Sequence, residues 1–308
     1  MSDPSNTGRD GAFDCLIVGA GPAGLLAATY LGRFRRRVIV IDAGESRAKW
    51  IPTTHNCPGF PDGISGIELL ERLKEQARRY GAVLVDDTVR DVRRDGTDFI
   101  ATASSPIRAR SVLMATGIVD TLPDVVDIAM MIEAGIVRLC PICDGYEVIG
   151  QRVGVIGSPE DAMKKALFMR TFTRQVTLLL TDPAAELDTL ARQKLIKAGI
   201  EVVPCVPTSI RAENNQANIS LVDGKVLAFD SIYPAMGCTV RSKLAVNLGA
   251  HCDEVGNLVV DSHQRTDIPG LYAAGDIVDE INQIAVAFGH AAVSASDIHN
   301  YLAEAAEN

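Results

Sequence analysis

The fold is decided by the stretch Phe13-Asp14-Cys15-Leu16-Ile17-Val18-Gly19-Ala20-Gly21-Pro22-Ala23-Gly24, a short apolar run that leads into closely spaced glycines. The apolar part is typical of a buried parallel strand, and residues 25–31 continue as an apolar helical stretch. In this context the first glycine makes a tight turn, the second admits a pyrophosphate, and the third lets helix and strand pack closely. The next strand, 38–41, ends in Asp42, which we expect to hold an adenosine ribose.

The second half of the chain repeats this plan. An expected strand at 152–156 leads into Gly157-Ser158-Pro159-Glu160-Asp161-Ala162, and a helical stretch to about residue 172 precedes a strand at 176–180. Nineteen residues separate Gly19 from Val38, and nineteen separate Gly157 from Val176. The strand end at 115–117 has a counterpart in residues 231–237. The sequence therefore predicts a duplicated nucleotide-binding plan.

The end of the chain returns to the first copy. Residues 267–276 form an expected turn, an apolar strand and an acidic end, and 281–302 form the last long helix. We predict an α/β fold with two Rossmann-like nucleotide-binding domains of the three-layer β/β/α type, the second inserted in the first. The first domain is expected to comprise 1–118 and 242–308, and the second 119–241.

Between the two copies lies Cys140-Pro141-Ile142-Cys143-Asp144-Gly145. Two residues between cysteines allow a small disulfide ring and can lower the pKa of one thiol, and the thiolate is the attacking species. Asp144 is placed to move the proton that this chemistry sheds or regains. A structural zinc site needs four ligands, and the chain has no second Cys-x-x-Cys and no His-x-x-x-His. We therefore predict a redox dithiol and no metal.

The composition limits the class of protein. A net charge of −9 and a pI of about 5.1 argue against a surface for nucleic acid or anionic membranes. The seven cysteines are odd in number and mostly isolated in apolar runs, which argues against a secreted disulfide framework. Residues 1–12 are polar, and no apolar run approaches the roughly 20 residues of a membrane span. We expect a soluble, cytoplasmic protein.

At these motifs the chain resembles the low-molecular-weight thioredoxin reductases, over essentially its full length. The match rests on residues 19–24, 56–59, 115–117, 140–145, and 268–270 through 275–276. The resemblance implies FAD in the first domain, with Gly275 and Asp276 at the ribityl–phosphate part and the start of the last helix at the isoalloxazine ring. The residues that it implies for cofactor binding are Gly19, Gly21, Pro22, Ala23, Gly24, Asp42, Thr54, Asn56, Val89, Ala115, Thr116, Gly117, Gly275, Asp276, Gln283, Ile284 and Ala285.

The resemblance also implies a mechanism. Electrons pass from the flavin to the Cys140–Cys143 disulfide, with Cys143 nearer the ring, and Cys140 then attacks the disulfide of a partner. Asp144 serves as the acid and base. The partner would be a thioredoxin-like protein or a small disulfide or dithiol, and family members are homodimers.

The second glycine motif departs from the family pattern. Pro159 stands where the family's NADPH site has its middle glycine, and proline offers no N–H to a phosphate. After the following strand, Asp182 stands where the family has basic residues for the 2′-phosphate. Proline in the first turn of a helix leaves the fold intact. We therefore predict that NADPH is not used, and that ferredoxin or another donor supplies the electrons.

Three alternatives remain. The protein is an NADPH-dependent thioredoxin reductase that tolerates Pro159, a dithiol oxidase that uses oxygen, or a flavin redox sensor without turnover. The oxidases often carry histidine after the second cysteine, whereas Asp144 stands here. His290 on the last helix is a candidate base near the flavin, although a helix-face histidine without chemistry is the simpler interpretation. His55 and Asn56 are the polar candidates in the loop 50–66, with a structural turn as the alternative.

Overall fold

The computed structural model describes residues 11–181, 187–204 and 207–307, and the chain divides into two compact units. The first unit comprises Met1–Lys49, Ile67–Val119 and Val240–Asn308, and the second comprises Trp50–Gly66 and Asp120–Thr239. The α/β class with two Rossmann-like units is confirmed. The expected boundaries at 118/119 and 241/242 remain predictions; the division by contacts differs from them mainly in grouping the loop 50–66 with the second unit.

The sheet of the first unit runs in the order β3-β2-β1-β6-β5-β4, and β16 also pairs with β6. Strands β1, β2, β3, β6 and β16 are parallel, whereas β4 and β5 form an antiparallel hairpin against the first half of β6. Because a parallel sheet is covered on both faces, its strands are apolar at successive positions. The bounds are β1 Phe13–Val18, β2 Val38–Asp42, β3 Val83–Asp86, β4 Asp91–Asp95, β5 Asp98–Thr102, β6 Pro106–Met114 and β16 Leu271–Ala273.

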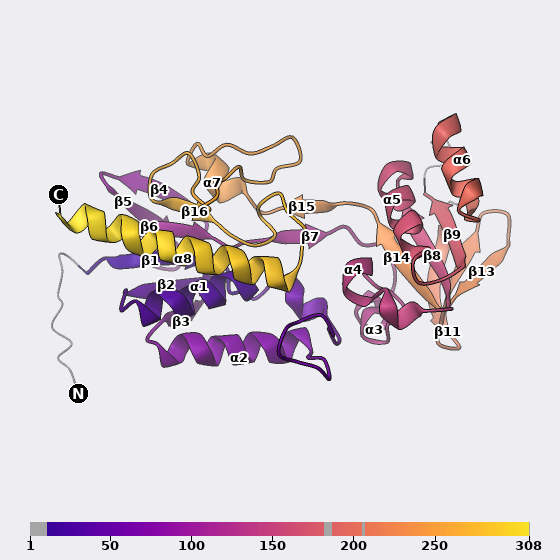
Figure 1. Cartoon of the computed structure of the whole chain (residues 1–308), viewed down its shortest axis with the longest axis horizontal. Helices are drawn as coiled ribbons and strands as arrows, with labels where there is room; N and C mark the ends of the chain where they lie inside the picture. Colours follow the sequence, from indigo (N-terminus) through magenta and orange to yellow (C-terminus); the bar gives the residue numbers. More distant parts are fainter. Residues whose placement is uncertain (1–10, 182–186, 205–206, 308) are drawn as a thin grey trace. The chain divides into compact units, whose positions relative to one another are not determined.

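Helices α1 (Pro22–Arg33) and α8 (Ile284–Glu307) pack against each other and against this sheet (Figure 1). Their buried residues include Ala27, Ala28, Ala291 and Ala295, whose small side chains let two helices approach closely. The expected last helix, 281–302, thus begins three residues later and ends five residues later. The remaining helical segments are η1 Arg47–Trp50, α2 Gly66–Arg79 and α7 Lys243–Asn247.

The second unit has a parallel sheet in the order β10-β9-β8-β14. Helix α5 (Pro159–Met169) packs on β8 and β9, and the antiparallel sheet β11-β12-β13 contributes to a second core cluster of this unit. The bounds are α3 Ile128–Glu133, α4 Pro141–Asp144, η2 Tyr146–Val148, β8 Arg152–Gly157, β9 Gln175–Leu180, α6 Thr189–Lys197, β10 Glu201–Pro204, β11 Pro207–Glu213, β12 Gln216–Leu221, β13 Val226–Phe229 and β14 Ser231–Ala235.

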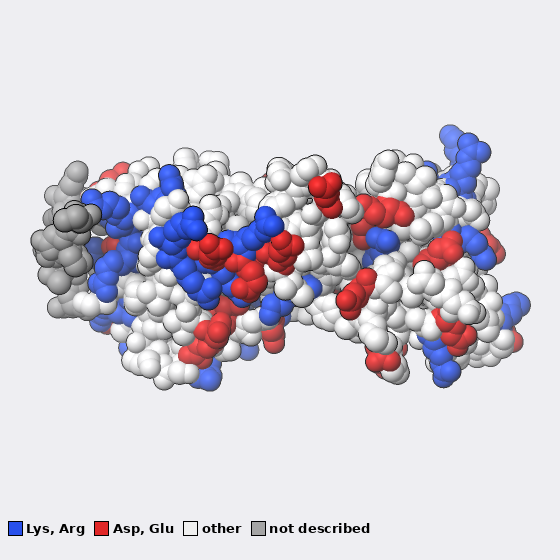
Figure 2. All heavy atoms as spheres, turned by 90° about the horizontal axis from the view of Figure 1, so that it is seen from below, with Lys and Arg blue, Asp and Glu red and all other residues white. Residues whose placement is uncertain are grey.

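The chain passes between the units through β7 (Ile118–Asp120) and β15 (Cys238–Val240), which pair with each other. Acidic and basic side chains are intermixed on the face in Figure 2, without one continuous basic patch. Helix α2 carries three ion pairs, which are Glu68–Arg72, Glu71–Lys74 and Glu75–Arg79. Within the described ranges, no helix is both long and apolar enough to cross a membrane.

Candidate active site and nucleotide-binding turns

The turn after β1 has the glycines that its packing requires. Gly19 adopts φ +105°, and a Cβ added there would lie 2.4 Å from the carbonyl oxygen of Ala115. A Cβ added at Gly24 would lie 2.0 Å from the carbonyl oxygen of Gly19. The first and third glycines are therefore needed for close contact between β1, α1 and the end of β6.

The middle glycine leaves the turn open. The nearest atom to a Cβ added at Gly21 is the Ser46 hydroxyl oxygen, at 3.5 Å, and Pro22 occupies the first turn of α1, where its missing N–H costs nothing. The N–H of Ala20 donates to Asp42 Oδ1 at 3.0 Å, so Asp42 also ties the turn to β2. The expected contact of Asp42 with a ribose stays a prediction.

Three further predicted segments converge beside this turn. The N–H of Ala115 donates to the carbonyl of Val18 at 2.9 Å, and the N–H of Ala274 donates to Met114 at 3.0 Å. A Cβ added at Gly275 would lie 3.0 Å from the Cβ of Ala23, at the start of α1, and 3.8 Å from that of Ala287 on α8. The structure therefore brings together the glycine turn, the end of β6, the start of α8 and the segment after β16, which includes Asp276.

Three other predicted cofactor residues come from further segments of the chain. Val89 is buried in the apolar cluster that contains Val18 and Met114. Thr54 and Asn56 belong to the loop that groups with the second unit, where the Thr54 hydroxyl donates to Asn56 Oδ1 at 2.8 Å. The remaining assignments from the family also stay predictions, among them Thr116 and Gly117 after β6 and Gln283, Ile284 and Ala285 at the start of α8.

His290 is partly buried and has a hydrogen-bonded ring. Its Nδ1 accepts from the N–H of Gly275 at 3.3 Å, which requires the proton of the neutral ring to be on Nε2. Burial lowers the pKa of His290, with the charge of Glu280 acting in the opposite direction. The contact gives His290 a structural role in holding the segment that contains Gly275.

In the second unit, Cys140 and Cys143 form a disulfide with a Cα–Cα distance of 5.3 Å. Cys140 is the N-cap of α4, and the N–H of Cys143 lies 3.2 Å from Cys140 Sγ and 3.0 Å from the Cys140 carbonyl. After reduction, a backbone N–H directed at this sulfur would favour the thiolate form of Cys140.

Asp144 is held by two partners next to the disulfide. Its Oδ2 lies 3.2 Å from Arg138 Nη1, and its Oδ1 accepts from the Tyr233 hydroxyl at 2.9 Å. Burial raises the pKa of Asp144, while the charge of Arg138 and the hydrogen bond from Tyr233 act in the opposite direction. A carboxyl with a raised pKa can carry a proton nearer neutral pH than an exposed one can.

The residues around α4 fix this geometry. A Cβ added at Gly145 would lie 2.4 Å from Phe172 Cε2 and 2.6 Å from the carbonyl oxygen of Pro141, so only glycine fits after Asp144. Lys165 on α5 donates to the carbonyls of Leu139 at 3.3 Å and Pro234 at 2.5 Å. These contacts hold the disulfide turn beside the carboxyl end of β14.

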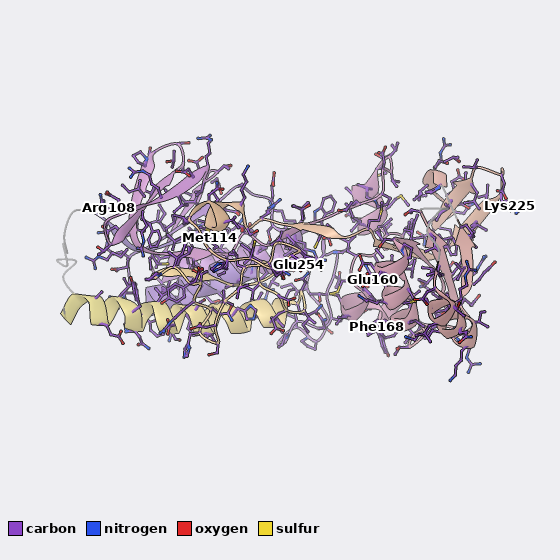
Figure 3. All side chains as sticks on the ribbon, turned by 90° about the horizontal axis from the view of Figure 1, so that it is seen from above. Arg108, Met114, Glu160, Phe168, Lys225 and Glu254 are labelled. Atoms are coloured by element: carbon purple, nitrogen blue, oxygen red, sulfur yellow. A yellow bond between two sulfur atoms is a disulfide. The ribbon has the colours of Figure 1, made fainter. Side chains whose placement is uncertain are left out.

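The turn after β8 keeps the fold but differs in its chemistry. A Cβ added at Gly157 would lie 1.9 Å from the carbonyl oxygen of Ala235, which matches the contact of Gly19 with Ala115. Pro159 is the first residue of α5, and Glu160 and Asp161 follow in the first helical turn (Figure 3 labels Glu160). Ala162 is fully buried in the position of Gly24. Asp182, the other predicted departure, lies outside the described residues.

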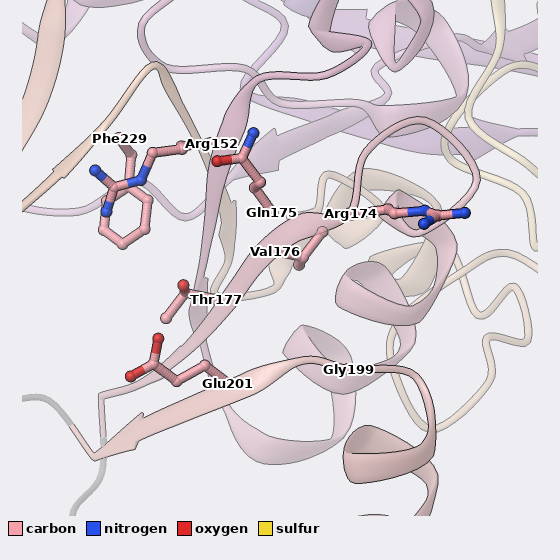
Figure 4. Close-up of a pocket in the computed structure, with 8 residues that line it drawn as sticks. All are labelled: Arg152, Arg174, Gln175, Val176, Thr177, Gly199, Glu201 and Phe229. Carbon is pink, nitrogen blue, oxygen red and sulfur yellow. The ribbon is translucent and has the colours of Figure 1, made fainter.

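A hollow of about 230 Å³ lies at the amino ends of the strands of this sheet, opposite the turn after β8 (Figure 4). It is lined by Arg152, Thr177 and Glu201 near the amino ends of β8, β9 and β10, and by Phe229. Parallel α/β sheets bind nucleotides at the carboxyl ends of their strands. The hollow is therefore at the wrong end of the strands to be the nucleotide site of this unit.

The sequence did not reveal Arg138, Tyr233 or Glu147. The first two contact the Asp144 carboxyl, and the charge of the third acts on its pKa. The duplication contained a signal for Tyr233. Its partner in β8 is Val155, two residues before Gly157, just as Leu113 pairs with Ile17, two residues before Gly19. A tyrosine at a position that is leucine in the other copy indicates a polar partner in the core. Arg138 and Glu147 have no such signal.

A redox disulfide beside a partly buried carboxyl, on two Rossmann-like units, defines a disulfide oxidoreductase. Residues 13–291 match the model of the pyridine nucleotide-disulphide oxidoreductase family. The thioredoxin reductase of Treponema pallidum is 30% identical over 94% of this chain and 97% of its own length. The crystal structure of HlmI has a TM-score of 0.89 and 27% identity, over 96% of this chain and 94% of that one.

The atypical thioredoxin reductase TRi from Desulfovibrio vulgaris Hildenborough is 32% identical, with a TM-score of 0.54, over 95% of this chain and 99% of that one. With a family model that covers most of its length, the chain belongs to the low-molecular-weight thioredoxin reductase family. It is a thioredoxin reductase-like flavin disulfide oxidoreductase. Members of this family typically bind FAD.

Proposed function

We propose that this protein binds FAD and reduces a thioredoxin-like protein or a small disulfide through Cys140 and Cys143, with electrons from a donor other than NADPH. Ferredoxin is one such donor. The observation that carries this proposal is the contrast between the open turn at Gly21 and the turn at Pro159, in a chain that keeps the complete disulfide site. The proposal includes a cytoplasmic homodimer, by similarity to the family.

The residues of the first unit fit FAD. Beyond its chain neighbours, only the Ser46 hydroxyl oxygen among the described residues would lie within 4 Å of a Cβ added at Gly21, so the turn has room for a pyrophosphate, and the start of α1 offers backbone N–H groups to phosphates. Gly275 and Asp276 would hold the ribityl–phosphate part, and Gln283, Ile284 and Ala285 would line the ring. When bound, the flavin would supply the electron pair that reduces the Cys140–Cys143 disulfide.

The reduced cysteines would then act by thiol–disulfide exchange. The Cys140 thiolate attacks one sulfur of the partner's disulfide, forms a mixed disulfide and releases one partner thiolate. The Cys143 thiolate attacks Cys140 Sγ, closes the protein disulfide and releases the second partner thiolate. The dithiol loses two electrons and two protons, and the partner gains them. Asp144 would take up a cysteine proton and return it to a leaving thiolate, with Tyr233 and Arg138 holding its carboxyl.

Electrostatics and backbone chemistry both support the exclusion of NADPH. Pro159 removes one backbone N–H from the phosphate-binding end of α5. Glu160 and Asp161 place carboxylates in the same first turn, where they already complement the helix dipole and would repel a pyrophosphate.

NADPH-dependent thioredoxin reduction is the second candidate. The observation in its favour is the similarity to thioredoxin reductases along nearly the whole chain, together with the family's description as pyridine nucleotide-disulphide oxidoreductases. It requires that a nicotinamide nucleotide bind in spite of Pro159.

A cysteine exchange tests the dithiol mechanism. Cys140→Ser is expected to abolish disulfide reduction while the purified protein keeps its flavin, because the attacking sulfur is lost and the first unit is unchanged. Turnover with a small disulfide and a chemically reduced flavin is the measurement, and the flavin content is read from the absorbance. Cys252→Ser, at an exposed free cysteine, is the matched control and should leave turnover unchanged. Persistent turnover in Cys140→Ser would rule out the mechanism.

A further inference from the structure

A second carboxylate lies near Asp144, and the sequence did not mark it. Glu147 is on η2, three residues after Asp144, and its Oε1 lies 2.9 Å from His55 Nδ1. Its other oxygen, Oε2, is buried and makes no hydrogen bond to any described residue. A buried carboxylate oxygen without a partner costs free energy. Stability alone therefore does not account for this glutamate.

The loop 50–66 is shaped to present His55 to Glu147. The backbones of Thr54 and Ile64 exchange two hydrogen bonds, at 2.8 and 3.0 Å, which close the loop. Gly63 has φ +79°, and a Cβ added there would lie 2.8 Å from His55 Cδ2 and 2.6 Å from Thr53 Cγ2. The histidine ring thus occupies space that any other residue at position 63 would fill. His55, Gly63 and Glu147 all belong to the second unit.

The charge of Glu147 acts on the groups that surround the disulfide. Burial is the main reason that the pKa of Asp144 is raised, and the charge of Glu147 acts in the same direction, whereas Arg138 and Tyr233 lower it. Burial and the neighbouring Asp144 raise the pKa of the Tyr233 hydroxyl, and the charge of Glu147 adds to them. When two carboxyls share a partly buried site, the charge of one disfavours ionisation of the other. His55 holds the other oxygen of Glu147, Oε1.

We infer that Glu147, oriented by His55, is a positioning residue that favours the protonated form of Asp144, from which Asp144 can deliver a proton to a leaving thiolate. In this account, Glu147 touches neither sulfur and acts only through Asp144. The inference rests on the proposed function, because a proton held at Asp144 serves thiol–disulfide exchange.

The first test follows the Asp144 carboxyl without turnover. The oxidised protein is studied by infrared spectroscopy while the pH is raised. The band of a protonated carboxyl is assigned to Asp144 if it is missing in Asp144→Asn. In Glu147→Gln, which keeps the side-chain shape, this band is expected to disappear at lower pH than in the wild type. Glu147→Asp, which keeps the charge, should restore the wild-type behaviour at least in part. Asp223→Asn, at an exposed carboxylate paired with Lys225, should change nothing.

The second test follows the reaction. The chemically reduced protein is mixed anaerobically with a small disulfide, and the single-turnover rate is measured against pH. Glu147→Gln is expected to move the alkaline fall of the rate to lower pH. His55→Gln should move it in the same direction by less, because Glu147 keeps its charge and loses only the contact that orients it. An unchanged infrared titration in Glu147→Gln would overturn the inference and leave the proposed function standing. A wild-type protein that shows no single turnover would instead overturn the proposed function.

Discussion

The two nucleotide-binding turns have the same backbone contacts but differ in what they can bind. Gly19 and Gly157 both approach the carbonyl oxygen at the end of the neighbouring strand, at 2.4 and 1.9 Å from an added Cβ. At the third position of the motif the first turn has Gly21 and the second has Pro159. The first turn of α1 has no acidic residue, whereas that of α5 has Glu160 and Asp161. The comparison shows that the glycine which packs strand against strand is a requirement of the fold. The middle glycine is a requirement of the ligand.

The largest expected difference between the copies is at the helix–strand contact. Gly24→Ala would place a methyl group 2.0 Å from the carbonyl oxygen of Gly19, so α1 must move. We expect a loss of about 1–3 kcal/mol in the free energy of unfolding, together with loss of flavin. Ala162→Gly in the second copy should cost only about 1 kcal/mol, from helix propensity, and keep the flavin.

Urea unfolding and flavin absorbance measure these two effects. Equal losses of stability and of flavin in Gly24→Ala and Ala162→Gly would contradict the claim that the copies differ in this contact.

Restoring the middle glycine should partly restore the second nucleotide site. Pro159→Gly returns one backbone N–H that can bond to a charged phosphate, which is worth about 1.5–3 kcal/mol, or tenfold or more in affinity. Adding Glu160→Gln and Asp161→Asn should raise the affinity further, because both carboxylates would otherwise repel the phosphates. Isothermal titration with NADPH measures the gain in affinity. Lys164→Gln, which removes a nearby positive charge, is the control and should not raise the affinity. Unchanged affinity in the triple variant would show that the turn is not what excludes the nucleotide.

A smaller effect is the pH dependence of stability that Asp144 gives to the second copy, where Tyr233 holds its carboxyl. Tyr233 occupies the strand position that Leu113 has in the first copy, and its hydroxyl holds Asp144. Because burial raises the folded-state pKa of Asp144 above 3.8, the protonated carboxyl stabilises the fold relative to the ionised one. That stabilisation is complete below pH 3.8 and is lost as the pH rises through the folded-state pKa.

The stability of Asp144→Asn relative to the wild type should therefore rise with pH over that interval. Urea unfolding at a series of pH values checks this, with Asp223→Asn as an exposed control that lacks the effect. A stability difference between Asp144→Asn and the wild type that falls with rising pH would reverse the sign of the argument.

The sequence predicted the fold well because its signals are local. The first glycine turn lies between a short apolar strand and a helix, and the repeated interval of nineteen residues predicted the second copy. The redox disulfide could also be predicted, since two cysteines at this spacing are close in any turn. The contact of Asp144 with Arg138 could not be predicted, and the only signal for Tyr233 was a tyrosine at a strand position that is leucine in the first copy. The pairing of His55 with Glu147 joins residues more than ninety positions apart.

The most direct test of the central claim is an anaerobic titration of the purified flavoprotein with NADPH and then NADH, followed by the flavin absorbance. The account predicts no bleaching by either nucleotide, and bleaching when a dithiol or photoreduced ferredoxin is added. Rapid, saturable bleaching by NADPH would contradict it, and would show that Pro159 is compatible with a working nicotinamide site.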